Sequence, residues 1–260
     1  MIGELLTEWR GHVLVLTLSN PSKRNALDPA LCNALAEAVR GMAEQEVRCA
    51  VLTADGDKAF CSGFDITALP SQSGLQDLGG NPFDPLIEAV AASSVPVVAA
   101  LNGSAFGGGC ELAATCDLRV GHAGVKLAIP PAKLGIVYAA RGLARLSALV
   151  GESRAREMFL AARTVQAHEA AQWGLIDYIV EADQVLPRAL EIAEGIAALA
   201  PLAVQGMRRS FEALMSQRAS LDPETSAELD RLRLAAFASE DGAEARAAFA
   251  EKRTPRFSGK

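Results

Sequence analysis

The chain has 260 residues, of which 50% are hydrophobic, and a formal net charge of -6 at pH 7. This length and composition provide one large domain or two modest ones with a substantial core, and they exclude a disordered chain. A nucleic-acid partner would require a basic surface, so the charge favours a small or neutral partner instead.

The cysteines and the N-terminus indicate where the protein works. The five cysteines are odd in number and contain no C-x-x-C pair, which predicts reduced thiols and a cytoplasmic location. Glu4 and Glu8 stand where a signal peptide needs basic residues, and no segment offers about 18 uninterrupted apolar residues. We therefore expect an untargeted chain that makes no membrane contact.

Strands and helices alternate in the first half of the chain. Asp28 and Pro29 are typical of the N-cap and first position of a helix, and apolar residues recur after them at three- and four-residue steps. Short aliphatic or β-branched segments bounded by turn residues predict buried strands at 12–19, 49–54, 95–102, 116–123 and 175–180. The pattern is typical of repeated β-then-α units.

The remaining segments are a loop and a helical tail. Residues 69–82 are rich in glycine and serine, and the β/α pattern resumes after them, which predicts a mobile flap rather than a linker. After about residue 140, Ala-rich amphipathic stretches predict mostly helix as far as residue 250. The sequence leaves open whether this tail is a satellite domain or packs on a neighbouring subunit.

The stretch "NGSAFGGGCE", residues 102–111, joins a predicted strand to a predicted helix. The first N–H groups of a helix have no intrahelical acceptor, and glycine lets an oxygen that gains negative charge approach them. Glu111 follows Gly108 by three residues and lies on the same helical face, where it resembles an acid or base beside an oxyanion hole. The alternative, equally open from spacing, is that the glycines permit close packing and Glu111 caps a neighbouring segment.

Other nucleotide, nucleophile and metal motifs fail on detail. A P-loop needs Lys and then Ser or Thr after the last glycine, and no G-x-G-x-x-G frame fits. Ser104 lacks the glycine that a nucleophile elbow requires two positions earlier. The histidines, His12, His122 and His168, show no spacing typical of metal ligands, so no metal site is predicted.

Five segments together resemble the enoyl-CoA hydratase/isomerase, or crotonase, superfamily. They are "NPSKRNAL" (20–27), "AFCSGFDI" (59–66), "NGSAFGGGCELAATCDLRV" (102–120), "AKLGIVYAARGLARL" (132–146) and "AAQWGLIDYIV" (170–180), in the order and spacing of the family. The resemblance implies an α/β fold with a crotonase-like β/α spiral core, residues 1–195, and a helical C-terminal trimerisation region, residues 196–260. It also implies a homotrimer or a dimer of trimers.

The resemblance carries site residues onto this chain. It implies that the backbone N–H groups of Phe64 and Gly108 hold a thioester oxygen as it becomes an enolate, with Glu111 beside them. The implied contacts with an acyl-CoA substrate are Lys23, Arg24, Ala26, Phe60, Ser62, Gly63, Asp65, Ile66, Gly107 and Pro131. Coenzyme A then enters as part of the substrate, and no separate cofactor is expected. Lys252 and Arg253 either reach a CoA phosphate or belong to a solvated basic tail.

The chain departs from the family at one position. Hydratases of this family carry a second glutamate where this sequence has Pro131, and related isomerases place a carboxylate there or at the position of Ala139. Water addition usually needs two proton-transferring groups, and the resemblance supplies only Glu111. The family favours enoyl-CoA hydratase-type lyase activity, whereas these residues predict slow hydration of crotonyl-CoA.

Tyr138 supports an alternative reaction. The run from Pro131 through Leu134 and Gly135 to Tyr138 resembles methylmalonyl-CoA decarboxylases of the same superfamily, which also lack the second glutamate. Decarboxylation of a malonyl-type thioester needs no base, and a tyrosine hydroxyl would orient the departing carboxylate. Tyr138 could equally fill the acyl pocket wall. A third alternative is a non-catalytic acyl-CoA-binding protein with this fold.

Overall fold

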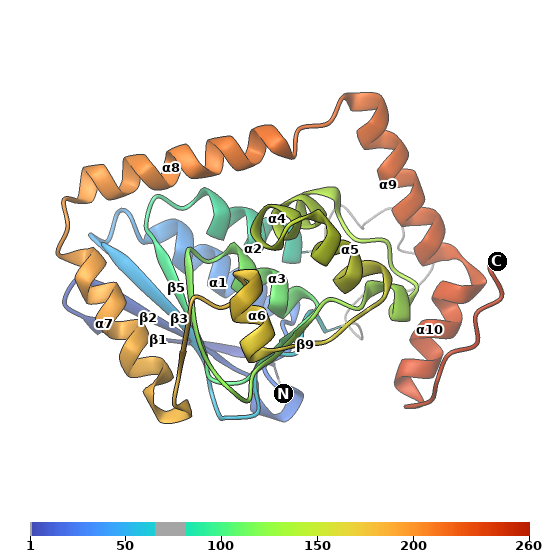
Figure 1. The fold of residues 1–260 in the computed structure, drawn as a ribbon, viewed down its shortest axis with the longest axis horizontal. Coiled ribbons are helices and arrows are strands. Elements are labelled where there is room, and N and C mark those ends of the chain that lie inside the picture. The colour runs from blue at the N-terminus through green and yellow to red at the C-terminus, as the bar shows by residue number, and fades with distance from the viewer. Residues whose placement is uncertain (1, 66–81) are drawn as a thin grey trace.

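The computed structural model describes residues 2–65 and 82–260, with a twisted β-sheet surrounded by helices (Figure 1). This larger sheet has the strand order β1-β2-β3-β5-β7-β10. Its strands are β1 (Glu4–Arg10), β2 (Val13–Ser19), β3 (Cys49–Ala54), β5 (Val97–Leu101), β7 (Leu118–His122) and β10 (Tyr178–Val180). All five predicted strands are confirmed, and the hairpin strand β1, which is mostly exposed, was missed because it shows no apolar alternation.

A smaller sheet with the order β4-β6-β8-β9 lies beside the first. Its strands are β4 (Ala59–Cys61), β6 (Ser104–Phe106), β8 (Lys126–Ala128) and β9 (Val165–Gln166). The chain passes from β3 to β4, from β5 to β6 and from β7 to β8, so each turn adds one strand to each sheet. The expected β/α spiral core is confirmed, but the strands of the smaller sheet, with two or three residues each, left no periodic signal in the sequence.

Side-chain alternation along the strands divides the core in two. Leu14, Leu16 and Leu18 of β2 join the main cluster, whereas Val13 and Val15 face a second cluster on the opposite side of the sheet. This two-residue period is what a strand buried on both faces requires. The main cluster continues under the loops that carry the candidate site.

Helices cover both faces of the larger sheet. They are α1 (Pro29–Gly41), α2 (Phe83–Ala92), α3 (Gly108–Thr115), α4 (Ala140–Val150), α5 (Glu152–Leu160), α6 (Ala167–Trp173), α7 (Val185–Ala197), α8 (Pro201–Arg218), α9 (Pro223–Ala238) and α10 (Glu240–Ala250). The Asp28 cap is confirmed, because its side chain accepts a hydrogen bond from Leu31 N at 2.9 Å. Helix α7 closes the second cluster with Val185, Ala189 and Ala193.

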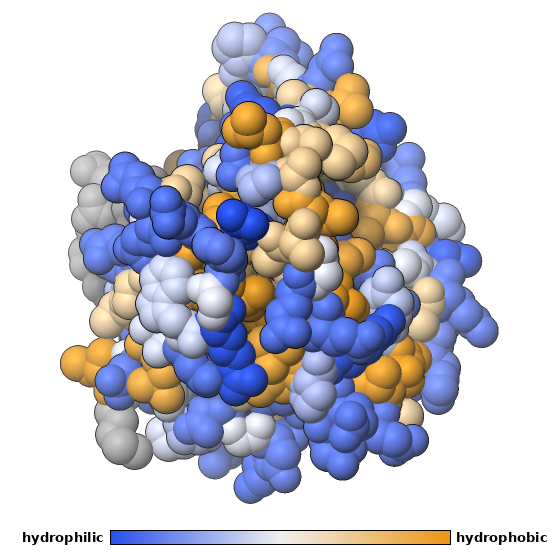
Figure 2. All heavy atoms as spheres, turned by 90° about the vertical axis from the view of Figure 1, so that its left-hand side faces the viewer, coloured by the Kyte–Doolittle hydropathy of each residue, from blue (hydrophilic) through white to orange (hydrophobic). Residues whose placement is uncertain are grey.

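The predicted helical tail is confirmed by α8, α9 and α10. Helix α8 runs along one side of the molecule, and α9 and α10 form an arm at the far end (Figure 1). Where α7 meets α8, hydrophobic side chains are exposed between hydrophilic ones (Figure 2), among them Leu199 and Leu202. Most of the loop expected at 69–82 lies outside the described residues, which resume at Pro82.

Within the described residues, no single helix is long and apolar enough to cross a membrane. One bent pair, Ala182–Ala197 with Pro201–Arg218, meets the length and composition criteria together, with an angle of 109° between its halves.

Candidate active site

Helix α3 begins with its first N–H groups facing the candidate site. Gly107 precedes it with φ of 54°, a left-handed conformation that glycine adopts without strain, and donates its own N–H to Ala128 O at 2.8 Å. Gly108 is the first helical residue, where the helix offers no acceptor for the N–H group. The predicted strand-to-helix turn is therefore confirmed, with a backbone donor at its apex.

Each of the three glycines has a separate reason to lack a side chain. An ideal Cβ on Gly109 would lie 2.4 Å from Cys61 O, so this glycine allows α3 to pack against β4. A Cβ on Gly108 would lie 2.8 Å from a ring carbon of Phe83. Close packing, one of the two interpretations of the glycine run, is confirmed at Gly109, whereas Gly107 and Gly108 form the turn that carries the donor.

The second backbone donor lies on the loop that contains Phe64. Ser62 N donates to Arg24 O at 3.1 Å, and Asp65 N donates to Leu27 O at 2.8 Å. Phe64 pairs with Leu27 in a parallel bridge, in which the residues on either side of Phe64 make the hydrogen bonds. The N–H of Phe64 therefore points away from Leu27, and it has no acceptor within the described part of the chain. An ideal Cβ on Gly108 would lie 3.4 Å from Phe64 N, so the two donors are close neighbours.

Asn25, which the sequence analysis missed, fixes the segment that supports this loop. It has φ of 55° and is 1% exposed, and its Oδ1 accepts a hydrogen bond from Asn20 N. Its Nδ2 donates to Asp55 O at 2.9 Å and to Ala59 O at 2.8 Å. Asparagine is one of the few residues that tolerates a left-handed backbone, and that preference was a usable signal.

Glu111 lies one turn into α3 and is 5% exposed. Tyr138 donates its hydroxyl to Glu111 Oε2 at 2.6 Å, and Arg145 Nη1 lies 3.3 Å from Glu111 Oε1. Burial raises the pKa of Glu111 above the ordinary value of 4.5, although the Tyr138 hydrogen bond and the Arg145 charge oppose this. Burial and the Glu111 charge raise the pKa of Tyr138, so Tyr138 remains a proton donor to the carboxylate at neutral pH.

Gly142 makes the contact between Tyr138 and Glu111 possible. An ideal Cβ on Gly142 would lie 2.6 Å from the Tyr138 ring and 2.8 Å from Glu111 Oε1. Phe159 supports the other side of the tyrosine, with ring centroids 5.1 Å apart. Tyr138 is therefore bonded to the carboxylate and does more than fill a pocket wall.

Two further charged residues reach the site from other elements. Asp84, in the first turn of α2, follows Phe83, and its charge helps to raise the pKa of Glu111. Arg233 of α9 lies 3.8 Å from Asp84 and opposes that effect on the pKa of Glu111. The sequence analysis missed both, since neither belongs to a recognisable motif and α9 is more than a hundred residues from α3.

The other candidate residues are spread around the donor loop. Lys23 Nζ lies 2.6 Å from Asp65 Oδ2, so these two expected CoA contacts pair with each other. Ser62 Oγ donates a hydrogen bond to Lys23 O. Arg24 is exposed, whereas Ala26 and Gly63 are buried. Phe60 is 0% exposed and belongs to the main core cluster, so it packs beneath the loop that contains Phe64 and does not face solvent. Ile66 lies outside the described residues.

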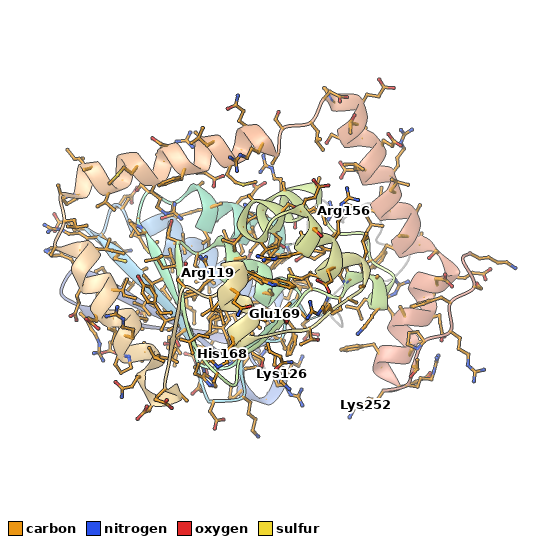
Figure 3. The ribbon with its side chains drawn as sticks, in the orientation of Figure 1. Arg119, Lys126, Arg156, His168, Glu169 and Lys252 are labelled. Atoms are coloured by element: carbon orange, nitrogen blue, oxygen red, sulfur yellow. The ribbon has the colours of Figure 1, made fainter. Side chains whose placement is uncertain are left out.

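Pro131 and Ala139 occupy the positions at which a second carboxylate was sought. Pro131 is buried at the start of a short 3₁₀ helix, Pro131–Leu134, and Ala139 is the N-cap of α4. Lys252, which follows α10, lies on the C-terminal arm, well apart from Arg119 in the larger sheet (Figure 3).

Within residues 2–65 and 82–260, no three His, Cys, Asp or Glu side chains gather as metal ligands would.

This geometry can hold an oxygen that gains negative charge and place one carboxylate beside it. Residues 8–260 match the model of the enoyl-CoA hydratase/isomerase family. The chain belongs to this family. It is accordingly an enzyme of the enoyl-CoA hydratase/isomerase type.

Similar proteins cover the whole chain. Carnitinyl-CoA dehydratase of Proteus mirabilis is 34% identical over 96% of this chain and 97% of its own length. The 2,3-dehydroadipyl-CoA hydratase of Escherichia coli is 34% identical, with all of both chains covered. A solved structure of methylmalonyl-CoA decarboxylase with 2-nitronate-propionyl-CoA has a TM-score of 0.93, 26% identity and full coverage of both chains. The crotonase-like fold expected from the sequence is thus confirmed.

Proposed function

We propose that this chain is an enoyl-CoA hydratase-type lyase, which adds water to an unsaturated acyl-CoA or removes it. The observation that carries the proposal is the pair of N–H donors at Phe64 and Gly108 with the buried carboxylate of Glu111 alongside. The donors stabilise the enolate oxygen, and Glu111, the carboxylate bonded to Tyr138, transfers the proton. The hydratase and dehydratase names of the curated relatives support this reaction.

The proposal assigns substrate binding to the donor loop. The exposed side chains of Lys23 and Arg24 provide positive charge for the CoA phosphates, and Ser62, Gly63 and Asp65 line the path to the thioester. Gly107 gives the thioester oxygen close access to the second donor. Coenzyme A is then part of the substrate, and the reaction uses no other cofactor.

Decarboxylation of a malonyl-type CoA thioester is the second candidate. Two observations favour it: Pro131 removes the second glutamate, and Tyr138 lies at the acid–base carboxylate with its hydroxyl engaged. The likeness to methylmalonyl-CoA decarboxylase over the full chain supports it as well. Loss of CO₂ would leave the same enolate in the same hole.

One parallel assay separates these reactions. Purified protein is offered crotonyl-CoA, followed by loss of the enone absorbance, and methylmalonyl-CoA, followed by CO₂ release. We expect hydration that is slow relative to a two-glutamate hydratase, and we expect Glu111→Gln to abolish it. Fast hydration would point to a further water-activating group, for which Asp84 is the candidate.

The remaining outcomes reassign the reaction. Release of CO₂ that falls in Tyr138→Phe, without hydration, would overturn the hydratase proposal in favour of decarboxylation. Tight acyl-CoA binding that Glu111→Gln leaves unchanged, with no product from either thioester, would indicate a non-catalytic binding protein.

We further propose a homotrimer or dimer of trimers, with residues 1–195 as the catalytic core and 196–260 as the assembly region. Met207, Phe211 and Leu214 of α8 form an exposed stripe at helical spacing, with Phe211 74% exposed in the single chain.

The five cysteines are buried free thiols, which supports a reducing, cytoplasmic location.

A further inference from the structure

Both oxygens of the Glu111 carboxylate are held, each by a different side chain. Tyr138 bonds Oε2 at 2.6 Å, and Arg145 lies 3.3 Å from Oε1. The Arg145 side chain is 13% exposed and the Glu111 side chain 6%, so the ion pair is largely shielded from water. A carboxylate held at both oxygens has one orientation relative to the neighbouring N–H donors.

Helix α4 places Arg145 next to the Glu111 carboxylate. Gly142 lies three residues before Arg145, on the same helical face, and its missing side chain leaves room for Glu111. Arg141, one turn before Arg145, instead points outward and pairs with exposed Glu88 at 2.8 Å. The two arginines share a helix but have different surroundings, so Arg141 is a matched control.

The charge of Arg145 counters the cost of burying Glu111. Desolvation raises the pKa of Glu111, whereas the Arg145 charge and the Tyr138 hydrogen bond lower it. Asp84 from α2 and Arg233 from α9 also act on the pKa of Glu111, with opposite signs, and they form a pair with each other. Among the residues that the structure describes, Arg145 is thus the cation in direct contact with the carboxylate.

We propose that Arg145 is a positioning residue of the active site, which fixes the orientation of the Glu111 carboxylate and keeps it ionised. This role rests on the proposed function of Glu111 as the proton-transferring group. A carboxylate that is buried without a contacting cation would take up a proton and lose its capacity as a base. Arg145 therefore acts through Glu111 and need not touch the thioester.

The first test measures the Glu111 carboxyl group directly and requires no turnover. Infrared difference spectra against Glu111→Gln follow the ionisation of this carboxyl with pH in wild type, Arg145→Met, Arg145→Lys and Arg141→Met. We expect Arg145→Met to raise the pKa of Glu111 by about one unit or more, a tenfold change in proton affinity. Arg145→Lys should recover most of that shift, and Arg141→Met should resemble wild type.

The second test separates orientation from charge. With the thioester that the wild type turns over, Arg145→Lys should lower kcat about tenfold or more with little change in KM, because lysine keeps the charge but not the fixed geometry. Equal pKa values of Glu111 in wild type and Arg145→Met would overturn the role of Arg145. If Arg145→Met fails to fold, wild-type kcat in Arg145→Lys and Arg145→Gln would overturn it. A shifted pKa in a protein that turns over no thioester would refute the proposed function alone.

Discussion

At the scale of single residues, the glycines near the Phe64 and Gly108 N–H groups lack a side chain for different steric reasons. The Gly109 position faces the backbone of β4, Gly108 faces an aromatic ring, and Gly142 faces Tyr138 and Glu111. A backbone atom cannot move aside as a flexible side chain can, so the consequences of adding a methyl group differ among these positions.

Gly109→Ala should therefore be strongly destabilising. The new Cβ would lie 2.4 Å from Cys61 O, and overpacking of this kind costs about 3 kcal/mol of unfolding free energy. Gly195→Ala on α7 is the control, because nothing lies within 4 Å of that Cβ and alanine stabilises a helix by about 0.5–1 kcal/mol. Thermal unfolding by circular dichroism measures both, and equal melting temperatures would contradict the packing argument.

The pH dependence of catalysis should report the Glu111 environment. Because burial raises the pKa of Glu111, kcat/KM for hydration should fall on the acid side with an apparent pKa above the ordinary 4.5. Tyr138→Phe removes a hydrogen bond that favours the ionised form, so the acid limb should move to still higher pH. An acid limb that stays in place in Tyr138→Phe would show that this hydrogen bond does not tune Glu111.

At the scale of elements, one buried side chain fixes α8 to the core. Arg208 is 7% exposed and donates to Asp117 Oδ2 at 2.9 Å and to the carbonyls of Val90, Ala91 and Ser93 at the end of α2. Carbonyls at a helix C-terminus lack intrahelical donors, which is why a guanidinium with five N–H groups suits this place. The position of α2, and so of Phe83 beside Gly108, depends partly on this contact.

Replacement of Arg208 should loosen this junction. Arg208→Met leaves the buried helix-end carbonyls without their donor and removes one of the two donors to Asp117 Oδ2, which Val97 N also bonds, so we expect a loss of about 1–3 kcal/mol of unfolding free energy. Arg209→Met, at the adjacent exposed position, should change stability little. Urea unfolding compares the two variants, and a small effect of Arg208→Met would assign the anchoring of α8 to apolar contacts.

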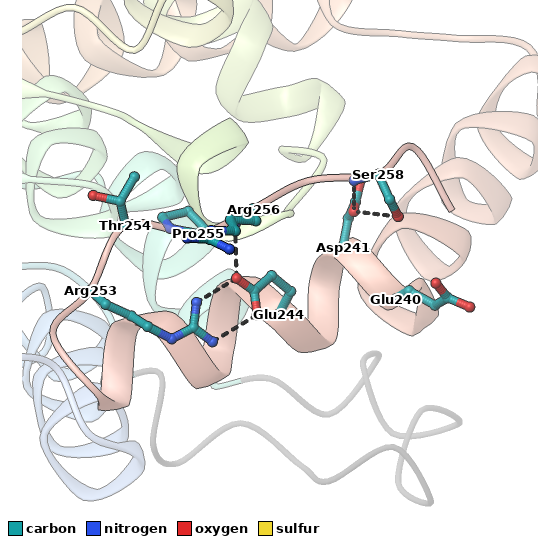
Figure 4. A pocket seen from close by; sticks show the side chains of 8 residues that line it. All are labelled: Glu240, Asp241, Glu244, Arg253, Thr254, Pro255, Arg256 and Ser258. Carbon is teal, nitrogen blue, oxygen red and sulfur yellow. Dashed lines mark hydrogen bonds and ion pairs between the residues drawn. The ribbon is translucent and has the colours of Figure 1, made fainter.

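The C-terminal tail is fastened to α10 by carboxylates. A hollow between them is lined by Glu240, Asp241, Glu244, Arg253, Thr254, Pro255, Arg256 and Ser258 (Figure 4). Glu244 pairs with Arg253 and accepts from Arg256 N, and Asp241 accepts from the N–H groups of Ser258 and Gly259. The Arg253 hydrogen bonds lower the pKa of Glu244 from 4.5 to about 2.

Acid should release this tail. Because the folded pKa of Glu244 is depressed, its contribution is complete above pH 4.5 and is lost as the pH falls toward 2. Hydrogen exchange of residues 254–260, corrected for intrinsic rates, should rise in that range, and Glu244→Gln should raise it already at pH 7. Glu240→Gln, in the same hollow, should not. Unchanged protection in Glu244→Gln would contradict this account.

At the scale of the whole molecule, the exposed stripe on α8 predicts assembly. Phe211 and Leu214 are 74% and 58% exposed in the single chain, which is costly for large apolar side chains that lie next to one another. Light scattering of the wild type at micromolar concentration should give a trimer or a multiple of it. Phe211→Glu should yield smaller species, whereas Arg209→Glu, on the opposite face of α8, should not, and a monomeric wild type would refute the proposal.

The sequence by itself determined the local elements and the backbone of the donor turn. The five predicted strands, the Asp28 cap and the Gly107–Glu111 turn depend on residues that are neighbours in the sequence. Their periodicity, capping and backbone preferences can therefore be read from short segments. The resemblance added the second donor at Phe64, which no local rule would have placed beside Gly108.

Only the tertiary structure decided how the carboxylate is surrounded. Tyr138 and Arg145 meet Glu111 across 27 and 34 residues, and Arg208 reaches α2 across more than a hundred. Such contacts depend on how the spiral brings separate turns together, and a single sequence carries no local signal for that distance. The smaller sheet could not be predicted from the sequence for the same reason. Its strands have only two or three residues, and they form because of the strands that they pair with.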